Sequence, residues 1–256
     1  MNKLLMTLHY AGYYLTSHNA HHIHSPFVYQ LYTRVISPDK NQKHFKEIEQ
    51  IRKQFLNNHN KIPTINSTNS ATEKSIADIA KNSLKSPRYA RLIYRLATYF
   101  NPSVCVELGT SLGISTLYLA SAIKGKVITL EGNNAVLQLA RQEFDKSSYG
   151  SRIETVQGMF DETLPGVLAG ISKTDFVFFD GNHQYEPTLK YFNMCLDKVH
   201  SKSVFVFDDI NWSEGMKRAW NEIKNHPKVT VTIDLFMMGL VFFDPDLSKQ
   251  DFVLRY

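Results

Sequence analysis

Apolar residues in the first hundred positions of the chain recur with the period of a helix. Between residues 44 and 58 they stand three or four positions apart, at Phe45, Ile48, Ile51 and Phe55. This spacing puts them on one stripe, so we predict an amphipathic helix over 44–58. Another helix is predicted from Ser86–Pro87 to Asn101–Pro102, because serine caps a helix and proline fits its first turn.

The segment between these two helices is polar. Residues 57–70 are rich in Asn, Ser and Thr, which predicts a loop. Ser70 and Glu73 have the spacing of a capping box, in which each side chain accepts from the other residue's backbone N–H. We therefore predict a helix from Ser70 to about Leu84.

After residue 102 the pattern changes to short apolar segments that alternate with helical ones. Apolar runs of strand length lie at 103–108, 126–131, 152–156, 175–180, 203–208, 229–235 and 239–243. Helical segments lie between them at 113–123, 134–146, 161–170, 185–199 and 213–225. No helix joins the last two strands, which predicts an antiparallel hairpin.

Repeated strand–helix units predict an α/β fold with helices on both faces of a mostly parallel sheet. The expected architecture is a Rossmann-like, doubly wound sheet of seven strands that closes with the C-terminal antiparallel hairpin. We assign residues 86–256 to this domain and residues 1–85 to a helical N-terminal extension. Such an extension either caps an active site or forms a homodimer, and both alternatives stay open.

Composition and charge narrow the choice of compartment and partner. The chain has two cysteines, so a disulfide framework is excluded and a reducing cytoplasm is expected. The apolar stretch at the N-terminus is short for a signal peptide, and no run suits a membrane span. Residues 1–100 carry 14 Lys and Arg against 5 Asp and Glu, whereas the rest carries 15 against 19. No basic run is dense, so solvated helix faces explain the asymmetry better than a nucleic-acid surface.

The clearest chemical signal is a glycine-containing turn between a strand and a helix. Glu107 ends an apolar strand, and the chain then passes through Gly109 and Gly113 directly into a helix. Glycine permits a sharp turn, and the start of a helix offers unpaired N–H groups. The next strand ends in Glu131, 24 positions after Glu107. A carboxylate at that place can accept hydrogen bonds from both hydroxyls of a ribose, so the pattern predicts a nucleoside-containing cofactor.

Two later strands also end in acidic residues. Asp180 is followed by His183 in one, and Asp208 and Asp209 end the other. Because parallel strands present their carboxyl ends at one edge, we expect these side chains to lie together. Carboxylates are ligands for Mg²⁺, Mn²⁺ or Ca²⁺, and such an ion lowers the pKa of a bound hydroxyl. His183 is suited to take the proton. Alternatively, the carboxylates position cofactor or substrate without a metal, and Asp209 caps a turn.

The segment Glu107–Gly113 resembles the first motif of class I S-adenosylmethionine-dependent methyltransferases, and Glu131 matches the acidic residue of their second motif. Ser111 replaces the middle glycine, as it does in many O-methyltransferases. The resemblance covers about residues 87–243, and it implies that Glu107 orders the turn and the methionine amino group while Glu131 holds the ribose. The residues implied to bind S-adenosylmethionine are Glu107, Gly109, Thr110, Ser111, Gly113, Ser115, Glu131, Gly132, Gly158, Met159, Phe160 and Asp180.

The later acidic segments resemble those of metal-dependent O-methyltransferases of the catechol and sugar types. The resemblance implies a divalent metal, Mg²⁺, Mn²⁺ or Ca²⁺, held by Asp180, Asp208 and Asp209, with Asp180 and His183 as catalytic residues. The expected reaction is O-methylation of a small hydroxylated acceptor. Asp209 stands where many catechol-type enzymes have Asn, so catechols are not singled out. Two alternatives stay open for the aromatic residues Tyr185, Trp212, Phe236 and Phe243: they help to line the acceptor pocket, or they pack in the core, which is the commoner role.

Histidines are concentrated near the N-terminus, at His9, His18, His21, His22 and His24. Helical spacing would put His18 and His22 on one face, which keeps a zinc site open as an alternative. We favour a docking segment, in which a helix starts at Ser25–Pro26 and packs against a neighbour through Phe27, Tyr29, Tyr32 and Val35. The motif His-Ser-Pro-Phe resembles one in an uncharacterised group of bacterial methyltransferase-like proteins.

Three competing functions are weighed against O-methylation. An RNA methyltransferase would suit the basic N-terminal part, but Asp-Gly-Asn-His stands where base N-methyltransferases carry Asn-Pro-Pro-Tyr. A catalytically silent binding module need not keep Glu107, Glu131 and Asp180 together. A nicotinamide-dependent dehydrogenase is disfavoured by the closing hairpin and by the lack of Gly-x-Gly-x-x-Gly.

Overall fold

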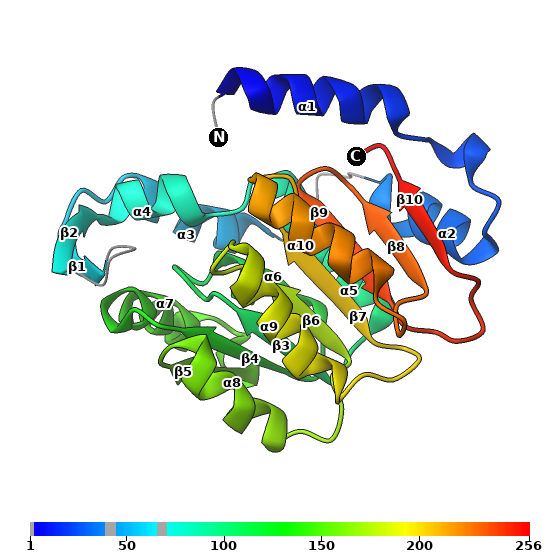
Figure 1. Cartoon of the computed structure of the whole chain (residues 1–256). Helices are drawn as coiled ribbons and strands as arrows, with labels where there is room; N and C mark the ends of the chain where they lie inside the picture. Colours follow the sequence, from blue (N-terminus) through cyan, green and yellow to red (C-terminus); the bar gives the residue numbers. More distant parts are fainter. Residues whose placement is uncertain (1–2, 39–44, 66–70) are drawn as a thin grey trace. The chain divides into compact units, whose positions relative to one another are not determined.

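The computed structural model describes residues 3–38, 45–65 and 71–256, and Figure 1 shows their helices and strands. The helices of the first hundred residues are α1 (Lys3–Thr16), η1 (Ala20–His22), α2 (Pro26–Leu31), the π-helical η2 (Tyr32–Ile36), α3 (Lys46–Leu56), α4 (Ile76–Ser83) and α5 (Pro87–Phe100). The later ones are α6 (Ile114–Ala122), α7 (Asn134–Lys146), η4 (Gly150–Arg152), α8 (Phe160–Ala169), α9 (Tyr185–Leu196) and α10 (Glu214–Asn225). No described helix is long and apolar enough to cross a membrane.

The strands form one large sheet and one hairpin. They are β1 (Lys61–Ile65), β2 (Ala71–Ser75), β3 (Val104–Leu108), β4 (Lys126–Glu131), β5 (Ile153–Gln157), β6 (Phe176–Phe179), β7 (Val204–Asp208), β8 (Val231–Asp234), β9 (Met238–Phe242) and β10 (Gln250–Val253). The large sheet has the order β10-β8-β9-β7-β6-β3-β4-β5. β9 is antiparallel to both β7 and β8, and the pairs β3–β4, β4–β5, β6–β7 and β8–β10 are parallel.

This architecture confirms the expected α/β fold, and all seven strands predicted from the sequence are present as β3–β9. The predicted number of strands was too low by one, because β10 adds an eighth strand to the sheet, parallel to β8. The sequence of β10, Gln-Asp-Phe-Val, has no apolar run or regular alternation. Only its pairing with β8 defines it as a strand.

The loop predicted for residues 57–70 is confirmed at 57–60 and wrong at 61–65, and the helix predicted from Ser70 to about Leu84 begins only at Ile76. Residues 61–65 form β1, which pairs antiparallel with β2, and Glu73 lies in β2 opposite Pro63. Ser70 lies outside the described residues. The helix α4 begins later, where Ser75 Oγ accepts a hydrogen bond from Asp78 N at 3.0 Å. Cross-strand pairing therefore holds Glu73 in a strand. The helix cap forms at Ser75, five residues after the predicted cap at Ser70.

By its internal contacts the chain divides into two compact units. The first contains Met1–Pro38 and Val167–Tyr256, and the second contains Asp39–Gly166. In the second unit, α6 is almost wholly buried because β4, α3 and α5 contact it. Its residues Leu117 and Tyr118 join a core with Phe45 of the segment before α3 and Phe144 of α7.

Helices cover both faces of the strands in the first unit. Trp220 of α10 packs on Gly239 of β9, on the same side as Phe207. Phe242 is three positions from Gly239 and therefore points to the opposite face. There it meets Phe27 of α2, with ring centroids 5.0 Å apart.

The docking of residues 25–36 is confirmed in most respects. Ser25 Oγ caps α2 by accepting from Val28 N, with Pro26 in the first turn. Tyr32 and Val35 are buried, and the Tyr32 hydroxyl donates to the carbonyl of Arg255 at 3.3 Å. The burial expected for Tyr29 is wrong, because 48% of it is exposed.

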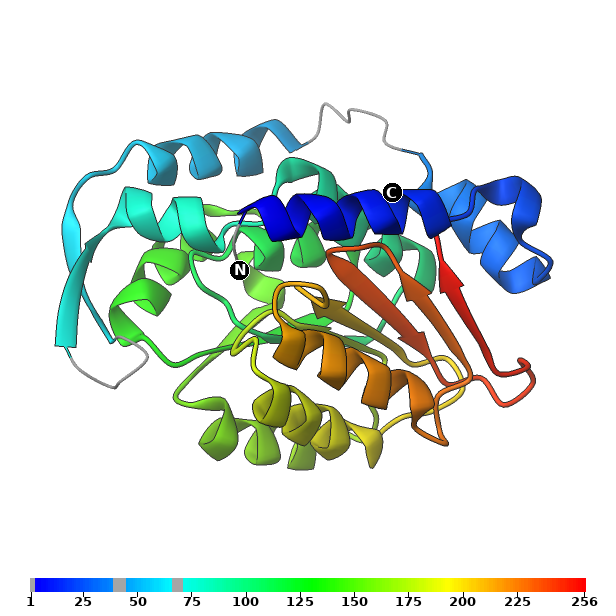
Figure 2. The same ribbon diagram turned by 45° about the horizontal axis from the view of Figure 1, so that its top comes forward.

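The first helix is held by the C-terminal residues of the same unit. The Tyr13 hydroxyl donates to the carbonyl of Leu254 at 2.5 Å and accepts from Tyr256 N at 3.1 Å. The N–H of Arg255 donates to the carbonyl of His18 at 2.9 Å. In Figure 2, α1 passes close to the ends of β8 and β10. The late strand β10 therefore positions α1.

Candidate functional site

The turn after β3 has an unusual backbone. Gly109, Ser111 and Gly113 have φ angles of 111°, 47° and 78°, in the region that favours glycine. A Cβ on Gly113 would also come within 2.5 Å of the Phe144 ring. Gly113 is therefore required both by the left-handed turn and by the packing of α7 against the start of α6.

Glu131 at the end of β4 is fixed by two backbone groups. Its Oε2 accepts from Ser111 N at 2.9 Å, and its Oε1 accepts from Asn133 N at 2.8 Å. Burial raises the pKa of Glu131, and these backbone hydrogen bonds oppose the rise. Because a carboxylate has about four acceptor positions, Glu131 keeps the capacity to accept from further hydroxyl groups.

Glu107 at the end of β3 is fully buried. Its Oε2 accepts from the hydroxyls of Thr116 and Thr129, at 2.5 and 2.7 Å. Within the described part of the chain, its Oε1 has no hydrogen-bond partner. Burial raises the pKa of Glu107 to about 7. A cationic or hydrogen-bond-donating ligand would offset this loss of hydration.

Residues after β5 lie next to the end of β4. Gly158 N donates to the carbonyl of Glu131 at 3.0 Å. A Cβ on Gly132 would lie 3.1 Å from Met159 Sδ, and 54% of Met159 is exposed. The turn from Gly158 to Phe160 thus borders the segment that carries Glu131, as an adenine-binding position would require.

The carboxylates at the ends of β3 and β4 have the chemistry that is needed to bind S-adenosylmethionine. Glu131 offers fixed acceptors for ribose hydroxyls, and Glu107 offers a buried acceptor without a partner. Sequence reasoning did not find the residues that hold these groups, namely Ser83, Thr116, Thr129 and Asn133. Ser83 of α4 contacts the turn, with its Oγ 2.7 Å from Ser111 Oγ. No local pattern marks Ser83, because its role depends on how α4 packs.

The second group of predicted residues lies in the first unit. Asp180, His183 and Asp208 each offer a ligand atom, and these atoms lie within 4.8 Å of one another. His183 Nε2 is 3.8 Å from Asp180 Oδ1 and also 3.8 Å from Asp209 Oδ2. Asp208 is buried at the end of β7, whereas Asp209 has a φ of 55° and turns the chain away from the strand.

This geometry gives His183 two roles that exclude each other. If its Nε2 binds a metal, that lone pair is not available to accept a proton. Two carboxylates and an imidazole form a donor set that fits Mn²⁺, whereas carboxylates alone also fit Mg²⁺ and Ca²⁺. Asp209 is outside the group of three, so it stays a predicted ligand on the strength of the sequence.

Other predicted residues are spread over the first unit. Phe236 lines a cavity, and Trp212 is 48% exposed. Phe243 packs on Phe205, with ring centroids 4.8 Å apart. The Tyr185 hydroxyl donates a hydrogen bond to the carboxylate of Glu222. Among the residues that the structure describes, the N-terminal histidines belong to no group of three candidate metal ligands.

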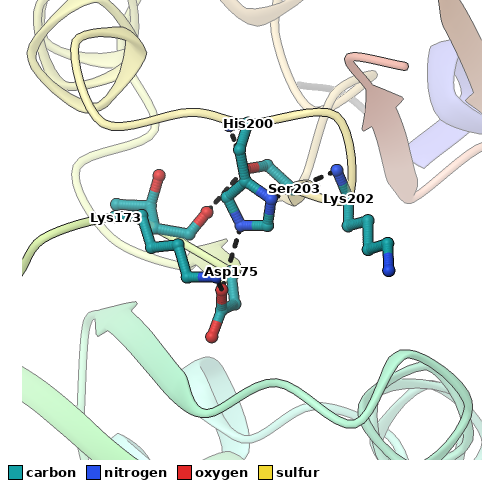
Figure 3. Close-up of polar contacts among 6 residues, drawn as sticks. Lys173, Asp175, His200, Lys202 and Ser203 are labelled. Carbon is teal, nitrogen blue, oxygen red and sulfur yellow. Dashed lines mark hydrogen bonds and ion pairs between the residues drawn. The ribbon is translucent and has the colours of Figure 1, made fainter.

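A second Asp–His pair lies at the opposite ends of the same strands. His200 Nε2 is 2.9 Å from Asp175 Oδ1, just before β6 (Figure 3). Ser203 Oγ accepts from the backbone N–H of His200 and donates to the carbonyl of Thr174 at 2.6 Å. The imidazole takes no part in the hydrogen bonds of the Ser203 hydroxyl. These contacts therefore join the segment before β7 to the segment before β6.

Comparisons with known proteins identify a matching family model and similar curated proteins. Residues 106–210 match the family model of a methyltransferase domain. The chain is 27% identical over 146 residues to a catechol O-methyltransferase of Niastella koreensis, covering 56% of this chain and 63% of that protein. It is 28% identical over 127 residues to a catechol O-methyltransferase of Mycobacterium tuberculosis, covering 49% of this chain and 56% of that protein. The alignments therefore span less than two thirds of these curated relatives.

Solved structures agree on the fold. An O-methyltransferase from Bacillus cereus in complex with SAH aligns with a TM-score of 0.60 and 18% identity, covering 80% of this chain and 92% of that one. The O-methyltransferase of tomaymycin synthesis from Streptomyces achromogenes, in complex with SAM, aligns with a TM-score of 0.61 and 18% identity. This alignment covers 80% of this chain and 91% of that one. The large sheet therefore has the fold of these solved O-methyltransferases, and residues 106–210 match a methyltransferase-domain model.

Proposed function

We propose that this chain transfers a methyl group from S-adenosylmethionine to a hydroxyl of a small molecule, assisted by a divalent metal. The observation that carries the proposal is the pair of fixed carboxylates, Glu107 and Glu131, around the left-handed turn at Ser111. The relatives called catechol O-methyltransferase support a hydroxylated acceptor.

The donor-binding role follows from the chemistry of these carboxylates. We assign the ribose hydroxyls to Glu131 and the methionine amino group to Glu107, whose buried Oε1 needs a donor. When bound, S-adenosylmethionine supplies an electrophilic methyl group on a positively charged sulfur. An ammonium group near Glu107 would lower its pKa from about 7, so binding and ionisation of Glu107 favour each other.

The acceptor-binding role is assigned to Asp180, His183, Asp208 and Asp209. A divalent ion held there would lower the pKa of a substrate hydroxyl and orient it. His183 accepts the hydroxyl proton if its Nε2 is not a metal ligand. The hydroxyl oxygen forms the new bond to the methyl carbon as the carbon–sulfur bond breaks, which leaves a methyl ether and S-adenosylhomocysteine.

The test combines calorimetry with transfer of a radiolabelled methyl group. We expect S-adenosylmethionine to bind, and we expect label transfer to catechol or 3,4-dihydroxybenzoate that falls more than tenfold with a chelator and returns with Mg²⁺ or Mn²⁺. No binding of S-adenosylmethionine would contradict the donor. Transfer that is equal with and without chelator would contradict only the role of the metal.

A further inference from the structure

One face of α1 lines a cavity of about 390 Å³ in the first compact unit. The α1 residues on this face are Leu8, His9, Gly12, Tyr13 and Thr16. Consecutive members stand one or three positions apart, so they share one side of the helix. The other walls include Asn211 in the segment between β7 and α10, and Phe236 in the turn between β8 and β9.

Gly12 stands at the centre of this helix face. Glycine inside a helix costs about 1 kcal/mol relative to alanine. A Cβ on Gly12 would have no described atom within 4 Å, whereas a Cβ on Gly239 would clash with Trp220 at 2.5 Å. Tight packing therefore does not explain the glycine in α1. Its effect is to leave space in the cavity.

The cavity wall carries one lysine. Lys217 Nζ is 3.0 Å from His9 Nδ1 and 2.9 Å from Glu214 Oε1. The side chain of Glu214 is 76% exposed, so water screens this ion pair and it contributes little. A ligand carboxylate can compete with Glu214 for Lys217.

The remaining walls set the orientation of a ligand. Asp234 is an acidic group that would repel an anion, and burial raises its pKa. Its Oδ1 accepts from Phe236 N at 2.7 Å. The rings of Tyr13 and Phe236 have centroids 5.2 Å apart and form an apolar wall. An anionic group is thus favoured at Lys217, and an aromatic or aliphatic body is favoured at the two rings.

We propose that this cavity binds the non-reacting part of the methyl acceptor, and that Lys217 selects an acceptor that carries a carboxylate. The assignment rests on the proposed function, because Asn211 stands two positions after Asp209 in the same segment. A molecule in the cavity therefore contacts the segment that begins at the proposed acceptor residues. One lysine matches the single charge of a carboxylate. In this proposal α1 forms one wall of the cavity, and Gly12 provides the space.

The test compares two ligands that differ in charge. Calorimetry in Mg²⁺ measures the binding of 3,4-dihydroxybenzoate and of its neutral analogue 3,4-dihydroxybenzyl alcohol. We expect the acid to bind at least tenfold more tightly to the wild-type protein. Lys217→Met should bring the two affinities within twofold of each other. Lys202→Met, at an exposed lysine outside the cavity, should keep the preference.

Gly12 variants test the location of the pocket. Gly12→Leu should weaken the binding of both ligands at least tenfold, whereas Gly12→Ala should stay within threefold of the wild type. Both variants should fold, because the space beside Gly12 is open. Failure of the acid to bind, equal wild-type affinities, a preference that survives Lys217→Met, or unchanged binding in Gly12→Leu would each overturn the proposal. Titration of the same samples with S-adenosylmethionine tests the proposed function separately.

Discussion

Ser111 donates its backbone N–H to Glu131 Oε2 at 2.9 Å, which ties the turn after β3 directly to the end of β4. The φ of 47° at Ser111 belongs to the same turn. A non-glycine residue in that conformation is costly, and such strain is found mainly where the surroundings hold it in place. Here one hydrogen bond to a half-buried carboxylate fixes the turn and the proposed ribose-binding group together.

Replacing Glu131 should separate cofactor binding from folding. Glu131→Gln keeps the size of the side chain but removes its charge and one acceptor oxygen. We expect S-adenosylmethionine to bind at least tenfold more weakly, as measured by calorimetry. Glu154→Gln is the matched control, because Glu154 lies on β5 with its side chain 51% exposed. Equal losses in both variants would contradict the role given to Glu131.

Glu107 should make the stability of the ligand-free protein depend on pH. Its pKa is about 7 in the folded state, against 4.5 as the reference value, because burial disfavours the charged form. Folding therefore takes up a proton between these values, and the free energy of unfolding falls as pH rises through them. The fall is about 2 to 3 kcal/mol between pH 5 and 8.

Urea unfolding at pH 5 and pH 8 measures this effect. Glu107→Gln cannot ionise, so we expect it to lack this decline, while Glu154→Gln should keep it. Saturating S-adenosylmethionine should reduce the decline in the wild-type protein if its amino group meets Glu107. The same pH dependence in Glu107→Gln as in the wild type would show that another group causes it.

The metal proposal predicts different outcomes for Asp208 and His183. Asp208→Asn should weaken Mn²⁺ binding at least tenfold, as followed by the paramagnetic effect on water relaxation. Asp246→Asn, at an exposed carboxylate, should bind Mn²⁺ like the wild type. His183→Gln decides between the two roles of the imidazole. Lost Mn²⁺ affinity marks a ligand, whereas retained affinity with at least a hundredfold loss of kcat marks a base.

Gly239 should be intolerant of a side chain for reasons of packing. A Cβ there would lie 2.5 Å from the Trp220 ring. Overpacking of this kind costs about 1 to 3 kcal/mol, so Gly239→Ala should lower the free energy of unfolding by that amount. Gly166→Ala is the control, because a Cβ on Gly166 in α8 meets open space. It should leave stability unchanged or raise it slightly. Urea unfolding measures both.

The sequence by itself determined the alternation of strands and helices from β3 to β9 and which of these strands end in acidic residues. These features are local. An apolar strand that ends in Glu107 and turns through Gly109 is readable because the required backbone and the required residue types coincide. The acidic residues at Asp180 and Asp208 could be assigned to one edge because parallel strands end at the same side of a sheet.

Only the tertiary structure decided the features that depend on distant partners. β10 is a strand because β8 pairs with it, and the capping pattern at Glu73 failed because β1 pairs with β2. Tyr13 meets Leu254 across 241 positions, and His9 meets Lys217 across 208. Periodicity reports the environment of a residue within one element, not which element lies against it. The cavity along α1 is therefore visible only in the tertiary structure and not in the sequence.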